Sequence, residues 1–261
     1  MIELKLNKDL EKVFTKIDFC YMCGCPFPSK ENKTRDHIPP SSIFQNSDKS
    51  PPLILPAHEN CNRGESTYDE EIGSLVGLLH GKGIDVDTSR LKVKAINIEN
   101  EIEIGAVPID FKHIIFRWVR GFHAALYNEC LPADTKKAVH PPMPSGKIDR
   151  GKIYNDNILP QHYEAVEIIK KNRSVNNLDR IECRNGQCTY ECVWMIRDRK
   201  WTCIFALNIY NWIDLGAEKY FTPRGCVGFY VLEKDCPNNA AEGTLLEIPI
   251  LNNDRLNPFD F

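Results

Sequence analysis

Residues 20–24 read CYMCG and residues 58–62 read HENCN, and these two stretches decide how the N-terminal part of the chain is expected to fold. Two cysteines separated by two residues and followed by glycine are typical of a zinc knuckle, whose tight turn directs both thiolates at one ion. An HxxC pair at the start of a helix places its two side chains on one side of that helix. Together the pairs predict one structural Zn²⁺ with four ligands: Cys20, Cys23, His58 and Cys61.

The stretch around these pairs, residues 18–65, is rich in Pro, Asn, Ser and Cys and has few large apolar residues. We expect that it cannot build a core of its own, so it is either disordered or held by a metal. Cys25 is an alternative to Cys23 as a ligand. A redox role for Cys20 and Cys23 is a further alternative, but the strand-to-helix context of a redox pair is missing.

The composition is ordinary for a globular protein, with 42% apolar and 26% charged residues among 261. The net charge of −3 gives no global basic field, so contact with nucleic acid would depend on a local patch. Eleven cysteines without a recognisable secretory signal favour reduced or metal-bound thiols and a cytoplasmic location. We find no run of 18 apolar residues and expect no membrane span.

Hydrophobic periodicity predicts an α+β protein with two parts. We expect an N-terminal module at residues 1–85 and, at residues 86–261, an α+β domain with an antiparallel sheet whose role the sequence does not indicate. A strong amphipathic helix is expected at residues 110–127. The other expected elements are helices at 1–17, 66–79 and 161–171, a hairpin at 91–107, a long loop at 131–160, a three-stranded meander at 180–212 and a strand at 226–232.

Four later cysteines fall within the expected meander and raise the question of a second zinc site. They are Cys183, Cys188, Cys192 and Cys203. Their places on neighbouring strands, close to Trp194 and Trp201, favour ordinary buried thiols.

Asp36 and His37 lie between the two zinc pairs, within the sequence RDHIPP of residues 35–40, and Asn62 directly follows the last zinc ligand. An Asp-His pair followed by an apolar residue and proline, placed between CxxC and a later [C/H]xxC-Asn, resembles the HNH endonuclease superfamily. It is most similar to the zinc-stapled, endonuclease VII-like subset of that superfamily. The resemblance covers about residues 18–71 and does not extend over the rest of the chain.

The resemblance implies a treble-clef, ββα-metal module, in which a β-hairpin is followed by a helix beside one catalytic divalent ion. His37 would be the general base that deprotonates the attacking water, and Asp36 and Asn62 would bind catalytic Mg²⁺ or Mn²⁺. These hard oxygen ligands leave positions open for phosphate and water. Arg35 and Arg63 flank the expected site and either bind the phosphate backbone or are solvated charges.

The expected function is therefore metal-dependent hydrolysis of phosphodiester bonds, with DNA as the favoured substrate. Two alternatives stay open: an HNH nuclease that cleaves RNA, and a treble-clef zinc module that binds nucleic acid or protein without cutting. Asp36, His37 and Asn62 favour a nuclease, because a purely structural zinc module requires none of them. The C-terminal domain is a candidate surface for a second copy of the chain or for a partner protein.

Overall fold

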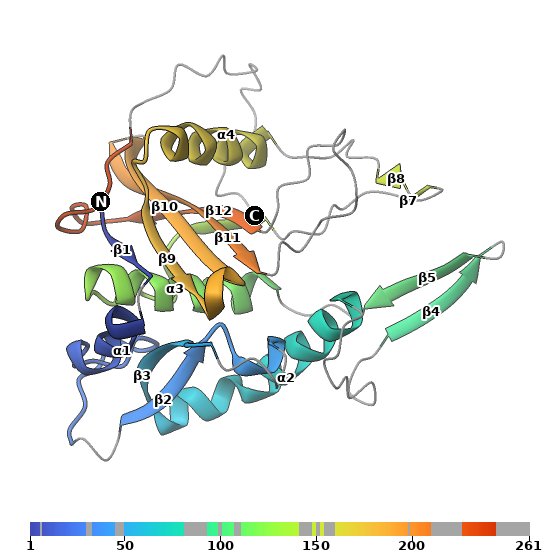
Figure 1. The fold of residues 1–261 in the computed structure, drawn as a ribbon, viewed down its shortest axis with the longest axis horizontal. Helices are drawn as coiled ribbons and strands as arrows, with labels where there is room; N and C mark the ends of the chain where they lie inside the picture. The colour runs from blue at the N-terminus through green and yellow to red at the C-terminus, as the bar shows by residue number, and fades with distance from the viewer. Residues whose placement is uncertain are drawn as a thin grey trace.

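The protein is a mixed α+β structure in which α-helices surround a six-stranded sheet (Figure 1). In the described part of the chain, no helix has the length and apolar character needed to cross a membrane. The computed structural model describes residues 1–5, 7–29, 33–44, 50–80, 93–98, 101–106, 111–140, 148–149, 152–153, 160–197, 199–209 and 226–243.

The central sheet has β1 at one edge and β6 at the other, and its longest strands, β10 and β11, pair over ten residues each. β1 is parallel to β9 and every other pairing in this sheet is antiparallel, so the sheet is mixed and not purely antiparallel as expected, because residues 3–4 of the N-terminal part add an edge strand. In spatial order the strands are β1 (Glu3–Leu4), β9 (Asp179–Cys183), β10 (Cys188–Arg197), β11 (Lys200–Ile209), β12 (Cys226–Leu232) and β6 (Lys137–His140).

Two helices cover the two faces of this sheet, α3 (Phe111–Tyr127) and α4 (Pro160–Ser174), as Figure 1 shows. Successive side chains of a strand alternate between faces, so Val193 packs in the α4 cluster while Trp194 packs in the α3 cluster. On the α3 face, the Phe122 ring stacks on Tyr190 at a centroid distance of 4.7 Å. This coverage explains why β10 and β11 are apolar on both faces.

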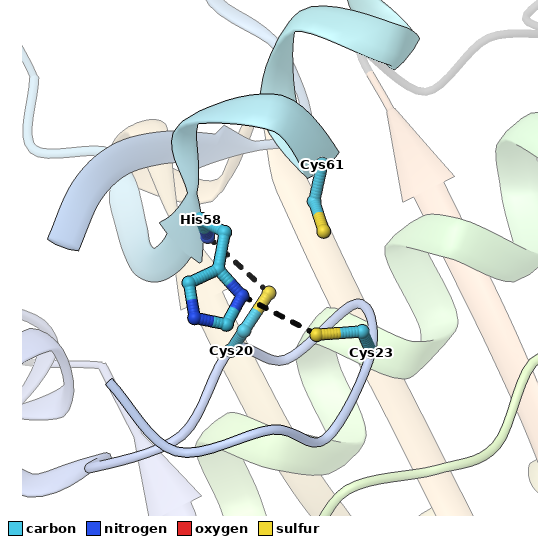
Figure 2. A group of neighbouring side chains, drawn as sticks. All are labelled: Cys20, Cys23, His58 and Cys61. Carbon is cyan, nitrogen blue, oxygen red and sulfur yellow. Dashed lines mark hydrogen bonds between the residues drawn. The ribbon is translucent and has the colours of Figure 1, made fainter. Parts of the chain in front are cut away.

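The N-terminal part packs against the other side of α3. It contains α1 (Asn7–Lys16), a hairpin of β2 (Lys33–Ile38) and β3 (Leu53–His58), a short 3₁₀ turn η2 (Ser41–Ile43) and α2 (Glu59–His80). Because β3 continues directly into α2, the start of this helix lies beside the turn at residues 20–24 (Figure 2).

One continuous buried cluster runs from this N-terminal part through α3 to the sheet. Residues 18–65 contribute to this shared cluster and do not form a separate one, since Tyr21, Ile38 and Leu55, each 1% exposed or less, pack within it. The expected boundary between residues 85 and 86 lies outside the described residues.

Several expected elements are confirmed, and others have different bounds. The hairpin of β4 (Val93–Ile98) and β5 (Glu101–Ala106) is present, as are α3, α4, the meander β9–β11 and β12. The first helix is shorter than expected, because residues 3–4 form β1, and α2 begins seven residues before residue 66. The expected loop at 131–160 contains β6 and a small hairpin of β7 (Ile148–Asp149) and β8 (Lys152–Ile153).

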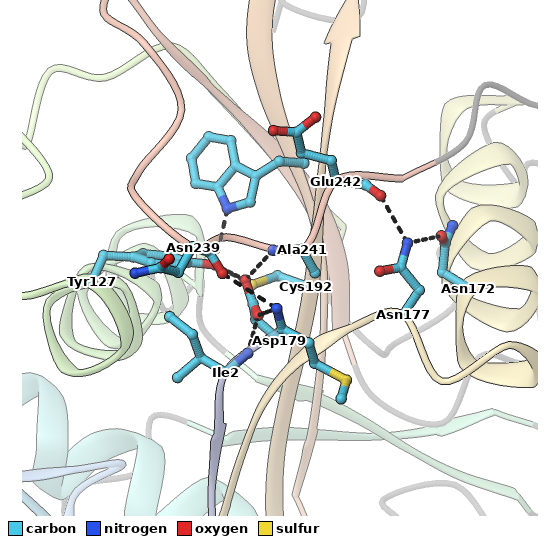
Figure 3. A network of polar contacts seen from close by, with 11 residues as sticks. Ile2, Tyr127, Asn172, Asn177, Asp179, Cys192, Asn239, Ala241 and Glu242 are labelled. Atoms are coloured by element: carbon cyan, nitrogen blue, oxygen red, sulfur yellow. Dashed lines mark hydrogen bonds and ion pairs between the residues drawn. The ribbon is translucent and has the colours of Figure 1, made fainter.

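Asp179 joins three distant segments of the chain through one fully buried carboxylate. This carboxylate accepts hydrogen bonds from the Ile2 amide at 2.5 Å, the Tyr127 hydroxyl at 2.8 Å and the Ala241 amide at 2.7 Å (Figure 3). The Tyr127 hydroxyl in turn accepts a hydrogen bond from the Trp194 indole at 2.9 Å. Asp179 thus ties β1 and the segment after β12 to the middle of the sheet.

Replacing Asp179 with alanine is expected to lower the free energy of unfolding by about 3–4 kcal/mol, because three donors, one buried and two partly buried, would lose their acceptor. Urea denaturation of both proteins measures this difference. Asp134 is exposed, so Asp134→Ala is a matched control that should stay within about 0.5 kcal/mol of the wild type. If the free energy of unfolding of Asp179→Ala also stayed within about 0.5 kcal/mol of the wild type, the Asp179 network would contribute no stability.

Candidate metal centre and adjacent acidic cluster

Four side chains meet at the junction of the turn at residues 20–24, the end of β3 and the start of α2 (Figure 2). The ligand atoms of Cys20, Cys23, His58 and Cys61 all lie within 4.8 Å of one another. Sulfur ligands of one tetrahedral zinc ion are separated by about 3.8 Å, so this group is compatible with Zn²⁺. The prediction that these four residues come together is confirmed.

The local backbone explains this convergence. The Gly24 amide donates to the Cys20 carbonyl at 2.8 Å, and the Cys20 amide donates to the Cys25 carbonyl at 2.9 Å. Gly24 has a φ of +77°, and a Cβ at this position would lie 2.9 Å from the Cys130 sulfur, so the turn requires glycine. His58 ends β3 and Cys61 follows in the first turn of α2, three residues later.

Contacts within the group already resemble those of a ligand set. The Cys23 sulfur lies 3.4 Å from Nδ1 of His58, and the His58 amide donates to the Cys20 sulfur at 3.3 Å. Burial, followed by the neighbouring Cys20 and Cys23 thiols, raises the pKa of Cys61 to about 12. A divalent cation would reverse this effect, because it favours thiolates and releases their protons.

The other cysteines lie outside this group. Cys25 is exposed, and its thiol faces the Cys23 carbonyl at 3.9 Å, so Cys23 and not Cys25 belongs to the ligand set. Among the described residues, no second group of three or more Cys, His, Asp or Glu side chains has this spacing. The four cysteines of the meander are buried in the sheet, as the interpretation as ordinary thiols predicts.

α3 holds the turn in place through Arg120, a residue that the sequence did not single out. Its Nη2 donates to the Met22 carbonyl within the CxxC turn, and its Nε donates to the Leu131 carbonyl at 2.7 Å. Arg120 is only 8% exposed. The sequence marks Arg120 only indirectly, as a charged residue within a helix whose other residues are almost all buried.

Asp36 lies on β2, and its side chain points into the protein, where the residue is 4% exposed. Its Oδ2 accepts a hydrogen bond from the Tyr21 hydroxyl at 2.5 Å. Burial raises the pKa of Asp36, although the nearby Arg117 guanidinium and the Tyr21 hydrogen bond favour the charged form. Asp36 is thus an interior carboxylate that accepts hydrogen bonds from Tyr21 of the turn at residues 20–24 and from the His37 backbone, and that lies near the Arg117 guanidinium of α3.

Arg117 gathers further acidic groups around Asp36. Its Nη2 forms an ion pair with Asp69 of α2, and its Nη1 lies 3.8 Å from Oε2 of Glu65. Burial raises the pKa of Asp69 to about 6. Since α2 begins at Glu59 and not at the expected residue 66, Asp69 lies in the middle of this helix and faces α3.

His37 follows Asp36 on β2 and is half-buried. Because neighbouring residues of a strand point to opposite faces, the His37 ring and the Asp36 carboxylate lie on different faces of the hairpin. Burial, followed by the positive charge of Arg184, lowers the pKa of His37. Arg184 in turn donates to the Ser50 carbonyl at 3.3 Å and to the Ser41 hydroxyl at 3.1 Å, so it joins both ends of the β2–β3 connection.

Asn62 lies in the first turns of α2, beside β2. Its amide nitrogen donates to the Arg35 carbonyl at 3.4 Å, which places it next to the backbone of Asp36. The described contacts include none between the His37 ring and Asn62. Arg35 is exposed above the Phe14 ring, and Arg63 is exposed and paired with Glu59 at 2.5 Å, so both guanidinium groups lie at the surface.

Asp36 and Asn62 carry oxygen atoms of the type that Mg²⁺ and Mn²⁺ prefer as ligands. The Asn62 amide nitrogen donates to the Arg35 carbonyl, and the Asp36 carboxylate accepts from the Tyr21 hydroxyl and from the His37 backbone amide. Three carboxylates (Asp36, Glu65 and Asp69) and one guanidinium (Arg117) give a net charge of −2 when all are ionised, which complements Mg²⁺ or Mn²⁺.

This chain matches no protein-family model, no curated protein and no solved structure. Its candidate site is therefore defined by the geometry and the chemistry of the residues themselves.

Proposed function

We propose that the protein is an HNH-type endonuclease that hydrolyses phosphodiester bonds in DNA with the help of a divalent metal ion. One observation carries the proposal: an antiparallel β-hairpin leads directly into a helix, and the group formed by Cys20, Cys23, His58 and Cys61 lies at their junction. The Asp36–His37 pair lies on the first strand of this unit, and Asn62 lies in the first turns of its helix. This is the arrangement that the resemblance to zinc-stapled HNH nucleases leads one to expect.

The register of the hairpin separates the two tasks. His58, a zinc ligand, pairs with Lys33, and His37 lies four residues further along the same strand. Four residues of an antiparallel strand span about 14 Å. The zinc ion would therefore stabilise the fold at one end of the hairpin and leave the His37 imidazole free for chemistry at the other.

The protein's own groups can carry out the proton transfer. A neutral imidazole is required to accept a proton from water, and the lowered pKa of His37 favours this form at neutral pH. Asp36 and Asn62 would hold Mg²⁺ or Mn²⁺ beside the scissile phosphate. When bound, such an ion stabilises the negative charge that develops on the phosphate and on the leaving 3′ oxygen. The exposed Arg35 and Arg63 would contact the phosphate backbone.

A second candidate function is a treble-clef zinc module that binds nucleic acid or protein without cutting. The observation that favours it is the placement of Asp36, which is buried against Tyr21 and lies on the opposite face of β2 from His37. In this alternative the Asp36 cluster would only join β2, α2 and α3. RNA as the substrate of a cutting enzyme is the third possibility.

A cleavage assay separates these functions. The purified protein is incubated with supercoiled plasmid, single-stranded DNA and RNA, each with Mg²⁺, Mn²⁺ or EDTA. We expect nicking of the plasmid that requires the divalent ion. Cleavage of RNA alone would reassign the substrate, and a zinc-loaded protein that cuts none of the three would support the non-cutting module instead.

A further inference from the structure

Tyr21 occupies a position that connects the two candidate metal sites. It lies between the zinc ligands Cys20 and Cys23 in the sequence and is fully buried. Its amide donates to the Pro56 carbonyl of β3 at 3.2 Å, and its hydroxyl donates to Oδ2 of Asp36 at 2.5 Å. One residue therefore contacts both strands of the hairpin from within the zinc turn.

The hydroxyl of Tyr21 is the side-chain hydrogen-bond donor that Asp36 has in the described part of the chain. Arg117, the nearest cation, directs its Nη2 at Asp69 and its Nη1 towards Glu65. Neither of these contacts would orient the Asp36 carboxylate. The Asp36 carboxylate also accepts a hydrogen bond from the backbone amide of its own neighbour His37, so Tyr21 is the contact through which the zinc turn influences its orientation.

We propose that Tyr21 is a positioning residue that couples the zinc turn to the catalytic metal site by orienting the Asp36 carboxylate. The inference rests on the proposed function, because it assigns a role within that site. Zinc bound to Cys20 and Cys23 holds the turn closed, and the turn holds the rigid phenol ring. The ring then presents its hydroxyl to Oδ2 of Asp36 and so sets the direction in which the carboxylate would face a cation.

The size of the effect follows from known metal sites. Groups that hydrogen-bond to a metal ligand typically change the metal affinity about 10–100-fold when they are removed. Tyr21→Phe removes one oxygen atom and keeps the buried ring, so it should leave the packing and the zinc ligands in place. We expect this variant to retain one zinc ion per chain and to bind Mn²⁺ about 10–100-fold more weakly than the wild type.

The experiment measures zinc content by elemental analysis, thermal melting, and Mn²⁺ binding through the electron paramagnetic resonance signal of the free ion. Tyr68→Phe is the matched control, because Tyr68 lies on the exposed side of α2 at 39% exposure. It should bind Mn²⁺ as the wild type does. In the cleavage assay, a high Mn²⁺ concentration should restore the activity that Tyr21→Phe loses at a low concentration.

The outcomes separate this inference from the proposed function. Wild-type Mn²⁺ affinity in zinc-loaded Tyr21→Phe, while the wild type binds Mn²⁺ and cuts DNA, would overturn the coupling alone. A wild type that neither binds Mn²⁺ nor cuts would overturn both. If Tyr21→Phe loses its zinc, Mg²⁺ is added to the wild type and to Asp36→Asn. The ultraviolet absorption of tyrosine is then compared with and without Mg²⁺. A change in the wild type that Asp36→Asn does not show supports the coupling, and no change in the wild type overturns it.

Discussion

Replacing His37 with alanine is expected to lower the rate of phosphodiester cleavage about 10²–10⁴-fold, the usual cost of losing a general base. The fold and the zinc should both remain. His37 is not in the zinc group, is only half-buried and makes no side-chain hydrogen bond among the described residues, so its ring contributes little to stability. Single-turnover nicking of supercoiled plasmid, together with zinc content and thermal melting, measures all three properties.

The matched control for this variant is His113→Ala. His113 is also a partly exposed histidine, but it lies on α3 and pairs with Glu65 at 3.1 Å. It should cut at nearly the wild-type rate. Asp36→Ala and Asn62→Ala should behave differently from His37→Ala, because they should weaken binding of the catalytic metal ion. Added Mn²⁺ should partly restore cleavage by whichever of these two variants has the smaller loss of metal affinity. A folded His37→Ala protein that cuts as fast as the wild type would remove His37 from the mechanism.

The convergence of Cys20, Cys23, His58 and Cys61 could be predicted from the sequence because their geometry is largely local. A CxxC turn and an HxxC at a helix start each bring two donors together through nearby backbone bonds, and their chemistry is specific enough to pair them. The helix α3 was predictable for a similar reason, since its period-3.6 stripe lies within one stretch of chain. β6 was not, because residues 137–140 become a strand only by pairing with Val227–Tyr230 of β12.

The residues that surround the candidate site could not be predicted from the sequence, because they too depend on contacts between distant parts of the chain. Three buried arginines from beyond residue 86 reach into the N-terminal part: Arg117 to Asp69, Arg120 to the Met22 carbonyl and Arg184 to the Ser50 carbonyl. The last two contacts span 98 and 134 residues of sequence. No periodicity or motif in a single sequence indicates such long-range contacts. The motif residues that these arginines support, in contrast, are recognisable from the sequence.

These contacts change what the C-terminal part is expected to do. A nuclease module held only by zinc would work when cut from the rest of the chain. Here α3 supplies both the buried surface behind the β2–β3 hairpin and Arg117, the cation that pairs with Glu65 and Asp69 of α2. The C-terminal part is thus structural support for the candidate site, in addition to any separate role.

Removing the zinc is expected to have the largest effect on stability. Zinc binding in small metal-held modules supplies about 10–16 kcal/mol, and much of this energy is folding energy. In this protein the packing of Leu55 and its neighbours on α3 offsets part of the loss, so we expect local unfolding of residues 18–65 while the sheet persists. Hydrogen exchange of the chelated protein should show protection lost in that stretch and retained in β10 and β11.

Substitution of single cysteines gives the same test without a chelator. Cys61→Ser removes a ligand, so we expect the zinc to be lost and the melting temperature to fall by roughly 10–20 °C, the equivalent of about 5 kcal/mol. Cys25→Ser is the matched control, since Cys25 directly follows the turn at residues 20–24, is exposed and lies outside the ligand group. It should keep one zinc ion per chain and melt as the wild type does. If Cys61→Ser instead retained the wild-type melting temperature, the turn would be held by its contacts with α3 and Arg120, and zinc would not be part of the fold.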